Sequence, residues 1–350
     1  MALEIGVLDG DGIGPEIVSA AVRVVSALDL DVEFVELPVG WDAYDEYGTT
    51  VPTFVLERVG TLDGWFLGPI LSGQYPEDDP AGGNPSPVFR TEFDLYSNLR
   101  PIRSYDGLGP AGMDVAIFRQ NTEGFLADRN MHVGDGQFMP TEDTAMSVRV
   151  VTREESRRIA RAAFAYADAH GMDVTAVHKG NVLRNAGDLF LEAVETVAES
   201  YPDVAWEPHL VDSFAMELAA NPTEHGVVVT TNLFGDILSD EAAGVVGSLG
   251  IAPGLNHNDE DGYAMAQATH GAAPDIAGEG VANPTSTILS GALLLEWLGG
   301  QGVAGAAKAA ETVDHAVTRT INAGVRTPDI GGDATTAEFT DAVIGRVQDA

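Results

Sequence analysis

Residues 231–241 read TNLFGDILSDE and come directly after three valines at residues 227–229. A short apolar run of this kind is typical of a buried strand. Beyond it, apolar residues recur at helical spacing, as Phe234, Ile237 and Leu238 show. A buried strand that leads straight into a helix is the building unit of an α/β protein.

Two carboxylates in this stretch, Asp236 and Asp240, lie four residues apart and therefore share one face of the predicted helix. Like charges at that spacing repel, whereas Mg²⁺ takes oxygen ligands and commonly binds through one or two carboxylates plus substrate. The pair therefore predicts a cation site. The alternative interpretation is a solvated acidic face, which is common in so acidic a chain, and the spacing alone leaves both open.

Composition excludes several classes of function. The 350 residues suffice for two domains or one large α/β domain. The formal net charge of −36 argues against binding to nucleic acid or to an anionic membrane surface. Without cysteine there is no disulfide framework and no thiolate zinc site. The N-terminus lacks the features of a signal peptide, and the longest apolar stretch, residues 288–298, is too short to span a bilayer, so we expect a cytoplasmic protein with no membrane partner.

The balance of charged residues is also unusual, because 54 are acidic and 18 are basic. Among the basic residues only Lys179 and Lys308 are lysines. Such a surface on a chain with an ordinary core repels itself unless salt screens the charges. The composition therefore predicts a halophilic protein.

Strand-like runs alternate with helical patterns along most of the chain, which favours a mainly parallel sheet with helices on its faces. The expected strands are Ile5–Leu8, Val32–Leu37, Gly64–Leu67, Val115–Phe118, Met146–Val151, Val174–Val177, Val204–Leu210 and Val227–Val229. The expected helices are Pro15–Leu28, Glu154–Ala169, Asp188–Ser200 and Ala306–Ala323. The stretch Gln74–Pro87, rich in Gly, Pro and Asp, predicts a loop on the substrate side.

The turn Gly10–Glu16 follows the first expected strand and reads GDGIGPE. Its third glycine comes one residue too early for the dinucleotide-binding fingerprint. We interpret it as a tight strand-to-helix turn with Pro15 near the first helical position, and phosphate binding is the less favoured alternative.

Four basic side chains are candidates for chemistry in a chain so poor in basic residues. Arg90, Arg100 and Arg119 can bind carboxylates bidentately, and ordinary surface ion pairing is the alternative. Lys179 follows an expected strand and can move a proton if burial lowers its pKa; a solvated loop lysine is the alternative.

Together, the motifs resemble those of the isocitrate/isopropylmalate dehydrogenase family, the β-decarboxylating dehydrogenases of 2-hydroxy acids, which includes homoisocitrate and tartrate or D-malate dehydrogenases. The resemblance covers essentially the whole chain. It rests on residues 10–16, 98–101, 119–124, 178–183, 211–212, 232–240, 270–278, 282–284 and 331–336.

The resemblance implies an isopropylmalate-dehydrogenase-like two-domain α/β fold with a mainly parallel sheet, distinct from the glycine-fingerprint dinucleotide fold. By position, residues 1–98 and 250–350 would form a large cofactor-side domain, and residues 99–249 a small domain with a dimer interface. It also implies a homodimer or higher homo-oligomer in which each active site borrows groups from the neighbouring subunit.

Carried over by motif, Asp236 and Asp240 would hold Mg²⁺ or Mn²⁺ together with Asp212 from a second subunit. Lys179, also from the second subunit, would accept the proton of the substrate hydroxyl, and Asp212 would assist it. The residues expected to contact a small 2-hydroxy diacid substrate are Arg90, Arg100, Arg119, Ser86 and Asn84.

The resemblance places the cofactor along the segment from His270 to Asn283, with His270, Gly271, Ala272, Pro274, Asp275, Ile276 and Asn283 as contacts. Asp275 and Ile276 match the relatives that use NAD. A carboxylate accepts a hydrogen bond from the adenosine 2′-hydroxyl and repels a 2′-phosphate, so we expect NAD rather than NADP.

The sequence departs from the family pattern at the chemistry itself. Leu126 stands where the family has a tyrosine thought to protonate the enolate. We therefore keep an alternative, a catalytically impaired or regulatory homologue that binds ligand. Before Arg90 the apolar receiver of isopropylmalate dehydrogenases is missing and Asn84 and Ser86 occur instead, which favours a small or polar substituent at C3 of the substrate. Residues 267–269, QAT, also replace the pattern of many relatives near the cofactor.

Overall fold

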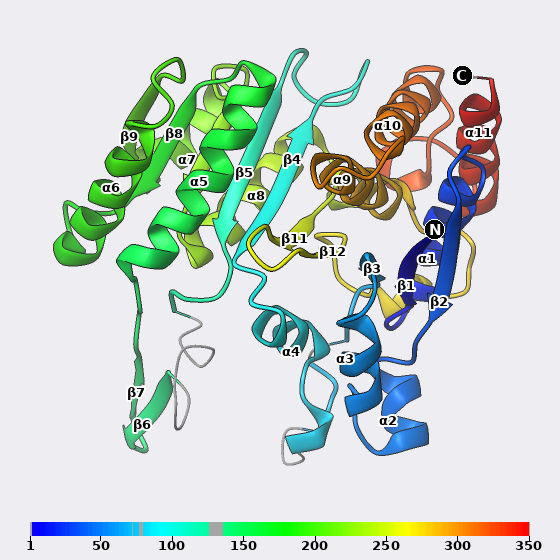
Figure 1. Ribbon diagram of the computed structural model, residues 1–350, viewed down its shortest axis with the longest axis horizontal. Coiled ribbons are helices and arrows are strands. Elements are labelled where there is room, and N and C mark those ends of the chain that lie inside the picture. The colour runs from blue at the N-terminus through cyan, green and yellow to red at the C-terminus, as the bar shows by residue number, and fades with distance from the viewer. Residues whose placement is uncertain (1, 72, 77–79, 126–135, 350) are drawn as a thin grey trace. The chain divides into compact units, whose positions relative to one another are not determined.

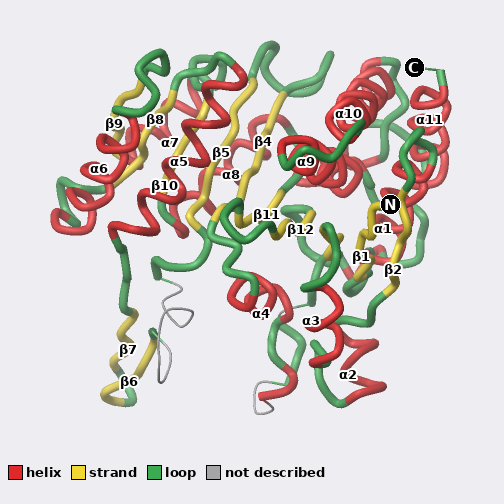
Figure 2. The backbone as a smooth tube through the Cα atoms, viewed as in Figure 1, coloured by secondary structure: helices red, strands yellow, loops and turns green. Residues whose placement is uncertain are grey.

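The structure is a computed structural model that describes residues 2–71, 73–76, 80–125 and 136–349. Strands and helices alternate through most of the chain (Figures 1 and 2), which confirms the predicted α/β class with a mainly parallel sheet. The chain divides into two compact units. Unit 1 comprises residues 1–93, 105–108 and 247–350, and unit 2 comprises residues 94–104 and 109–246.

Unit 1 includes both chain ends, and its described residues form five strands in the order β2-β1-β3-β12-β11. β1 pairs in parallel with β2 and β3, β3 pairs in parallel with β12, and only β11 runs antiparallel to its neighbour β12. The strands are β1 Leu3–Leu8, β2 Val32–Glu36, β3 Gly64–Leu67, β11 Leu255–Asn258 and β12 Tyr263–Ala266.

The helices of unit 1 are α1 Gly14–Ser26, α2 Trp41–Tyr47, α3 Thr53–Val59, α4 Pro85–Glu92, α9 Thr285–Gly300, α10 Ala306–Asn322 and α11 Thr336–Gln348. α9 is apolar on nearly every side and is buried along most of its length, as expected of a helix in the core of a layered domain. α1 and α10 pack against α9.

Unit 2 contains the strand order β4-β5-β10-β8-β9. β5, β10, β8 and β9 are parallel, and β4 runs antiparallel to β5. The strands are β4 Ser97–Arg103, β5 Asp114–Gln120, β8 Val174–His178, β9 Trp206–Leu210 and β10 Val227–Thr230. A separate antiparallel hairpin is formed by β6 Gln137–Thr141 and β7 Thr144–Ser147.

Within unit 2, helices cover both faces of the sheet (Figure 1). α5 Arg153–His170 and α6 Arg184–Ala198 lie on one face, and α7 Val211–Ala220 and α8 Asn232–Val246 on the other. Because both faces are covered, β10 is completely buried, which explains why its sequence is a continuous run of valines.

Three sequence expectations need correction. The strand expected at Met146–Val151 is β7, Thr144–Ser147; beyond it the Val148 amide donates to the Gly136 carbonyl at 2.8 Å and Val150 forms an isolated bridge to Gly124. The loop expected to reach Pro87 ends at Asn84, because the Asn84 side chain accepts a hydrogen bond from the Ser86 amide, 3.0 Å away, and caps α4. The helix expected from Asp188 begins at Arg184.

Among the described residues, none of the helices combines the length and the apolar character that a membrane crossing requires.

Candidate active site

The parallel strands of unit 2 bring chemically active side chains to one edge of the sheet. Arg119 lies opposite Thr230 near the ends of β5 and β10, and His178 lies opposite Leu210 at the ends of β8 and β9. The residues that follow those strands therefore share an edge with Arg119: Lys179 comes after β8 and Asp212 begins α7. The carboxyl ends of parallel strands are the usual place for ligands in α/β folds.

The antiparallel strand β4 brings Arg100 close to Arg119. Asn98 of β4 lies directly opposite Arg119 of β5, and residues two apart on a strand share a face, so Asn98 and Arg100 point to the same side. That side is covered by α8, which packs on both strands.

Arg119 is held by the start of α8. Its Nε and Nη2 donate to the Asn232 side-chain oxygen at 2.8 and 2.6 Å, and its Nη1 donates to the Asp236 carboxylate. A Cβ on Gly235 would lie 2.6 Å from the Arg119 Cβ, so only glycine lets the helix approach the arginine this closely. Asn232 also donates to the Glu123 carbonyl oxygen at 2.8 Å, which fixes its own orientation.

Arg100 contacts the next turn of the same helix. Its Nη1 donates to Ser239 Oγ at 2.7 Å and lies 3.4 Å from Asp236 Oδ1 and 3.8 Å from Asp240 Oδ1. Its Nε donates to Asn98 Oδ1 at 3.0 Å. Two arginines therefore converge on the two carboxylates that the sequence singled out.

In this cluster the basic side chains are more deeply buried than the acidic ones. The side chains of Arg100 and Arg119 are 7% and 5% exposed, whereas those of Asp236 and Asp240 are 48% and 55% exposed. Burial lowers the pKa of Arg100, and the carboxylates beside it oppose that shift. Burial and the neighbouring Asp236 raise the pKa of Asp240. The carboxylates thus form the solvent-facing side of a cluster whose cationic side is buried.

Lys179 and Asp212 form an ion pair with each other within one chain. The lysine side chain is 23% exposed, and its hydrogen bond holds the pKa of Asp212 below the usual range. Within the described residues, Asp212 does not join Asp236 and Asp240 in a group of three potential metal ligands. One chain therefore offers two carboxylates for a cation, which suits Mg²⁺ or Mn²⁺ only if further oxygen ligands arrive from substrate, water or another chain.

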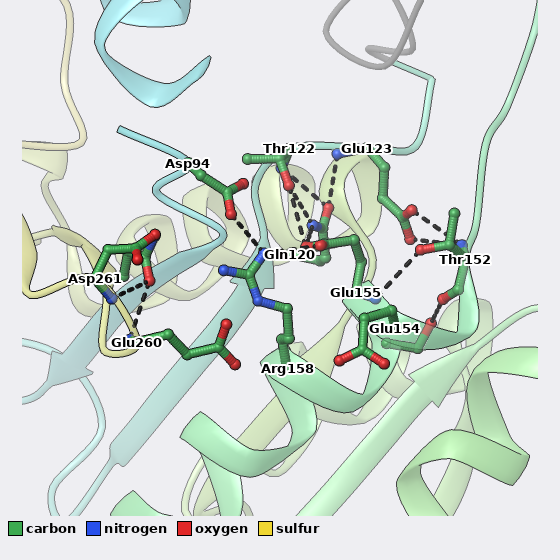
Figure 3. Close-up of polar contacts among 12 residues, drawn as sticks. Asp94, Gln120, Thr122, Glu123, Thr152, Glu154, Glu155, Arg158, Glu260 and Asp261 are labelled. Carbon is green, nitrogen blue, oxygen red and sulfur yellow. Dashed lines mark hydrogen bonds and ion pairs between the residues drawn. The ribbon is translucent and has the colours of Figure 1, made fainter. Parts of the chain in front are cut away.

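A buried polar network begins at Gln120, the last residue of β5 (Figure 3). Glu123 is buried, and its carboxylate accepts hydrogen bonds from the Thr152 amide at 3.0 Å. The Gln120 side chain accepts from the amides of Thr122 and Glu123 and donates to Glu155 at 3.1 Å. Burial raises the pKa of Glu123 to about 7.

The same network ends in an arginine of α5 (Figure 3). Arg158 pairs with Glu155 at 2.8 Å and with Asp94 at 2.7 Å, and its guanidinium lies 3.9 Å from the Tyr96 ring centroid. Asp94 has a φ of 44°, which a non-glycine residue rarely adopts, and the ion pair to Arg158 anchors it there.

In unit 1, three predicted substrate contacts lie together at α4. Arg90 and Ser86 are four residues apart and share one face of the helix. Both contact Gln267, which follows β12: Arg90 Nη2 donates to Gln267 Oε1 at 3.0 Å, and Gln267 Nε2 donates to Ser86 Oγ at 2.9 Å. Asn84 serves as the N-cap of α4, so its side-chain oxygen is already used by the helix.

The predicted cofactor segment, from His270 to Asn283, is an irregular stretch of unit 1 that is exposed in its middle and buried at Ala282 and Asn283, with a short 3₁₀ turn at Pro274–Ile276. Asp275 is exposed. Asn283 is buried and donates to Asp329 at 3.0 Å while accepting from the Thr285 amide at 3.0 Å, so it fixes the start of α9. The remaining predicted contacts of the segment, Gly271, Ala272 and Pro274, follow one another along it.

His270 supplies the observation that this segment suits a bound group. Its Nε2 is buried and has no hydrogen-bond partner among the described residues, while Nδ1 lies 3.0 Å from the Gly271 carbonyl oxygen. Burial lowers its pKa, so the ring is uncharged at neutral pH; because Nδ1–H donates to the Gly271 carbonyl oxygen, Nε2 is left to accept one hydrogen bond from a ligand. The residues present therefore fit a polar cofactor along the segment.

Three buried polar residues belong to these clusters and were not singled out from sequence: Asn232, Ser239 and Asn98, which orient the two arginines. Gln267, noted from sequence only as a departure near the cofactor, joins Arg90 to Ser86. The sequence signal that could have identified them is an amide or hydroxyl side chain within the same motifs that carry the arginines and aspartates. Leu126, the predicted departure from the tyrosine of the family, lies outside the described residues.

The fold and this cluster define the class: an α/β protein with buried arginines and solvent-facing carboxylates at the carboxyl edge of a parallel sheet. The chain belongs to the isocitrate/isopropylmalate dehydrogenase family, because the sequence model of that family matches residues 4–343. Members of this family are β-decarboxylating dehydrogenases, which generally use NAD(P) and a divalent metal.

Named relatives match over almost their full length. An isocitrate/homoisocitrate dehydrogenase of Thermus thermophilus is 40% identical, covering 98% of each chain. A 3-isopropylmalate dehydrogenase of Methanothermobacter thermautotrophicus is 39% identical, covering 99% of each chain. The crystal structure of isocitrate dehydrogenase from Methylococcus capsulatus has a TM-score of 0.88 at 37% identity, covering 99% of both chains. A β-decarboxylating dehydrogenase of Thermococcus kodakarensis, in its apo form, has a TM-score of 0.84 at 37% identity, covering 99% of this chain and 96% of that one. These likenesses confirm the predicted family and fold.

Proposed function

We propose that the protein catalyses the NAD-dependent, Mg²⁺- or Mn²⁺-dependent oxidative decarboxylation of a 3-carboxy-2-hydroxy acid. The observation that supports this most directly is the pairing of buried Arg100 and Arg119 with the half-exposed carboxylates of Asp236 and Asp240. Such a cluster offers oxygen ligands to a cation and guanidinium groups to the carboxylates of a diacid side by side.

Each candidate site residue of unit 2 has a role in the proposed reaction. Arg100 and Arg119 would bind and orient the substrate carboxylates, and their burial strengthens that interaction. Asp236 and Asp240 would hold the cation. Lys179, in its neutral amine form, would take the hydroxyl proton, and the Asp212 carboxylate in contact with it would stabilise the resulting ammonium. When bound, the cation supplies Lewis-acid polarisation of the substrate oxygens, and NAD supplies the acceptor for the hydride from C2.

The preference for NAD is proposed from Asp275. Its side chain is exposed on the cofactor segment, where a carboxylate can accept a hydrogen bond from a ribose hydroxyl and would repel a 2′-phosphate. The family as a whole uses NAD or NADP, so this preference is argued from Asp275 and not from family membership.

A small or polar substituent at C3 of the substrate is proposed from α4. Around Arg90 the structure places the Ser86 hydroxyl and the Gln267 amide, which bond to each other at 2.9 Å, rather than an apolar surface. A branched alkyl group there would lie against polar side chains instead of an apolar surface that could receive it. That Arg90, Ser86 and Asn84 contact the substrate stays a prediction.

We also propose that unit 2 carries a homodimer interface and that Lys179 and Asp212 serve the active site of the second copy. Large apolar side chains are exposed on the helices and loop that carry the site residues: Met216 on α7 is 64% exposed and Ile237 on α8 is 57% exposed. Exposed apolar side chains gathered on neighbouring elements mark an interaction surface. Phe138, Met139 and Met146 of the β6–β7 hairpin are exposed as well.

Co-expression of two inactive variants tests the shared site. Chains with Lys179→Ala and chains with Asp240→Asn, carrying different tags, would be isolated as mixed dimers. If Lys179 serves the other copy, one of the two sites in a mixed dimer is complete, and an unsorted mixture should recover about a quarter of the wild-type rate. Activity no higher than that of either variant alone would show that each site is built from one chain.

The reaction itself is tested with a panel of 2-hydroxy diacids: isocitrate, homoisocitrate, isopropylmalate, D-malate and tartrate. Each is incubated with NAD and Mn²⁺ at high salt while NADH and CO₂ are followed together. Equal amounts of NADH and CO₂ are expected from at least one diacid with a small or polar C3 substituent. NADH without CO₂ would indicate simple dehydrogenation, and neither product from any diacid would favour a homologue that binds ligand without turnover.

A further inference from the structure

The turn Gly10–Glu16 has no part in the chemistry proposed above, yet it contacts the predicted cofactor segment closely. The Ile13 amide donates to the Ala272 carbonyl oxygen at 2.9 Å. Gly12, with a φ of 59°, lies so close to the same carbonyl that a Cβ on it would be 2.1 Å from the oxygen. The glycine is thus required by a close backbone approach, not by a phosphate.

The backbone next to this contact is strained. Ala273 has a φ of 37°, which places an alanine in the left-handed region at a cost of about 1–3 kcal/mol. A strained conformation persists only where its surroundings fix it. Ala273 itself is exposed, and two backbone hydrogen bonds restrain it: the Ile13 amide donates to the carbonyl of the preceding residue, and the Ile276 amide donates to the Ala273 carbonyl at 3.2 Å.

The far end of the segment is held by the same turn. Glu16, in the first turn of α1, accepts a hydrogen bond from the Ala282 amide at 3.2 Å. The Thr336 hydroxyl, at the start of α11, contacts the Glu16 carboxylate and lies 2.6 Å from the Ala282 carbonyl oxygen. Both peptide groups of Ala282, which precedes the predicted cofactor contact Asn283, are therefore fixed.

We propose that Gly12 and Glu16 are positioning residues that preorganise the cofactor segment, Gly12 at its Ala272 end and Glu16 at its Ala282 end. The inference rests on the proposed function, because it assigns NAD to that segment. A segment held in its binding conformation before the cofactor arrives loses less conformational entropy on binding. If only a fraction of the molecules holds that conformation, the apparent Kd rises by the inverse of that fraction.

The first test compares Gly12→Ala with Gly48→Ala. Both glycines have a positive φ, 59° and 71°, so both alanines carry similar backbone strain. A Cβ at Gly48 meets nothing within 4 Å, whereas at Gly12 it collides with Ala272. The Kd of NADH is measured by fluorescence titration without substrate. We expect it to rise about tenfold or more in Gly12→Ala and to stay within about twofold of wild type in Gly48→Ala. Equal Kd values for the two variants would overturn the proposal.

A second pair of variants keeps the test decisive if Gly12→Ala does not fold. Glu16→Gln keeps an oxygen that can accept from the Ala282 amide, and Glu16→Ala removes it. The proposal expects weaker NADH binding and a higher KM for NAD in Glu16→Ala, with little change in the KM of the acid substrate, and recovery in Glu16→Gln. Unchanged NADH binding in Glu16→Ala would overturn it. If the wild-type protein binds neither NADH nor NADPH, the proposed function fails instead, and the inference fails with it.

Discussion

Glu123 gives the sharpest quantitative prediction. It is buried at the end of β5, and burial raises its pKa from the ordinary 4.5 to about 7, although the Thr152 amide and Arg149 favour the charged form. One pKa unit corresponds to about 1.4 kcal/mol between the two protonation states. The shift therefore corresponds to about 3 kcal/mol of folding free energy.

The sign of the effect follows from proton binding. Between pH 4.5 and about 7 the folded protein holds the proton on Glu123 and the unfolded chain has lost it. The free energy of unfolding of the wild type should therefore fall by about 3 kcal/mol from this group as the pH rises from about 4.5 to about 8. Glu123→Gln keeps the neutral form and an oxygen for the Thr152 amide at every pH.

The assay is urea unfolding of wild type and Glu123→Gln at fixed high salt, at several pH values. Because all other groups titrate alike in both proteins, the difference between their unfolding free energies isolates Glu123. It should shift in favour of the variant by about 3 kcal/mol from about pH 5 to about pH 8. Glu154→Gln, which alters an exposed neighbour, is the control and should leave the stability nearly unchanged. A constant difference, or one that shifts toward the wild type, would refute the reasoning.

Four further predictions concern the proposed function. Asn232→Ala removes two hydrogen bonds to Arg119, so the KM of the acid substrate should rise about tenfold or more while NADH binding is unchanged; kinetics and titration check this. Asp240→Asn should weaken Mn²⁺ binding about tenfold or more in calorimetry, and unchanged binding would move the cation elsewhere. Replacing Asp275 and Ile276 with Lys and Tyr should shift the ratio of kcat/KM values from NAD toward NADP, and an unchanged ratio would count against the assignment. Removing salt by dialysis should lower the thermal unfolding temperature, because the net charge of −36 is then unscreened; a protein that stays equally stable is not halophilic in this sense.

The class of fold could be predicted because local patterns agreed with the tertiary structure. The valine run of β10 and the helical spacing after it occur as strand and helix, since a strand covered on both faces must be apolar throughout. β4 was not predicted, because its local sequence pattern does not resemble that of a strand. Ser97–Arg103 contains Asn98, Arg100 and Arg103, and polar side chains at a functional edge hide the alternation that marks a strand.

Helix boundaries were predicted less well than the existence of the helices. α4 starts at Pro85 because the Asn84 side chain caps it, although the surrounding Gly and Pro residues indicate a loop.

The hairpin β6–β7 is exposed on all sides, so no buried face imposes a pattern on its sequence.

The sequence by itself determined which chemical groups are present: a pair of carboxylates at helical spacing, three arginines in a chain almost without lysine, and a glycine turn that cannot be the dinucleotide fingerprint. Spacing along the chain also fixed that Asp236 and Asp240 share one helix face. Only the tertiary structure decided which groups meet. Arg100 reaches that helix because β4 runs antiparallel to β5 in a register that puts Asn98 opposite Arg119. Such contacts depend on strand pairing between distant segments, and the pairing is set by packing of the whole sheet and not by any local pattern.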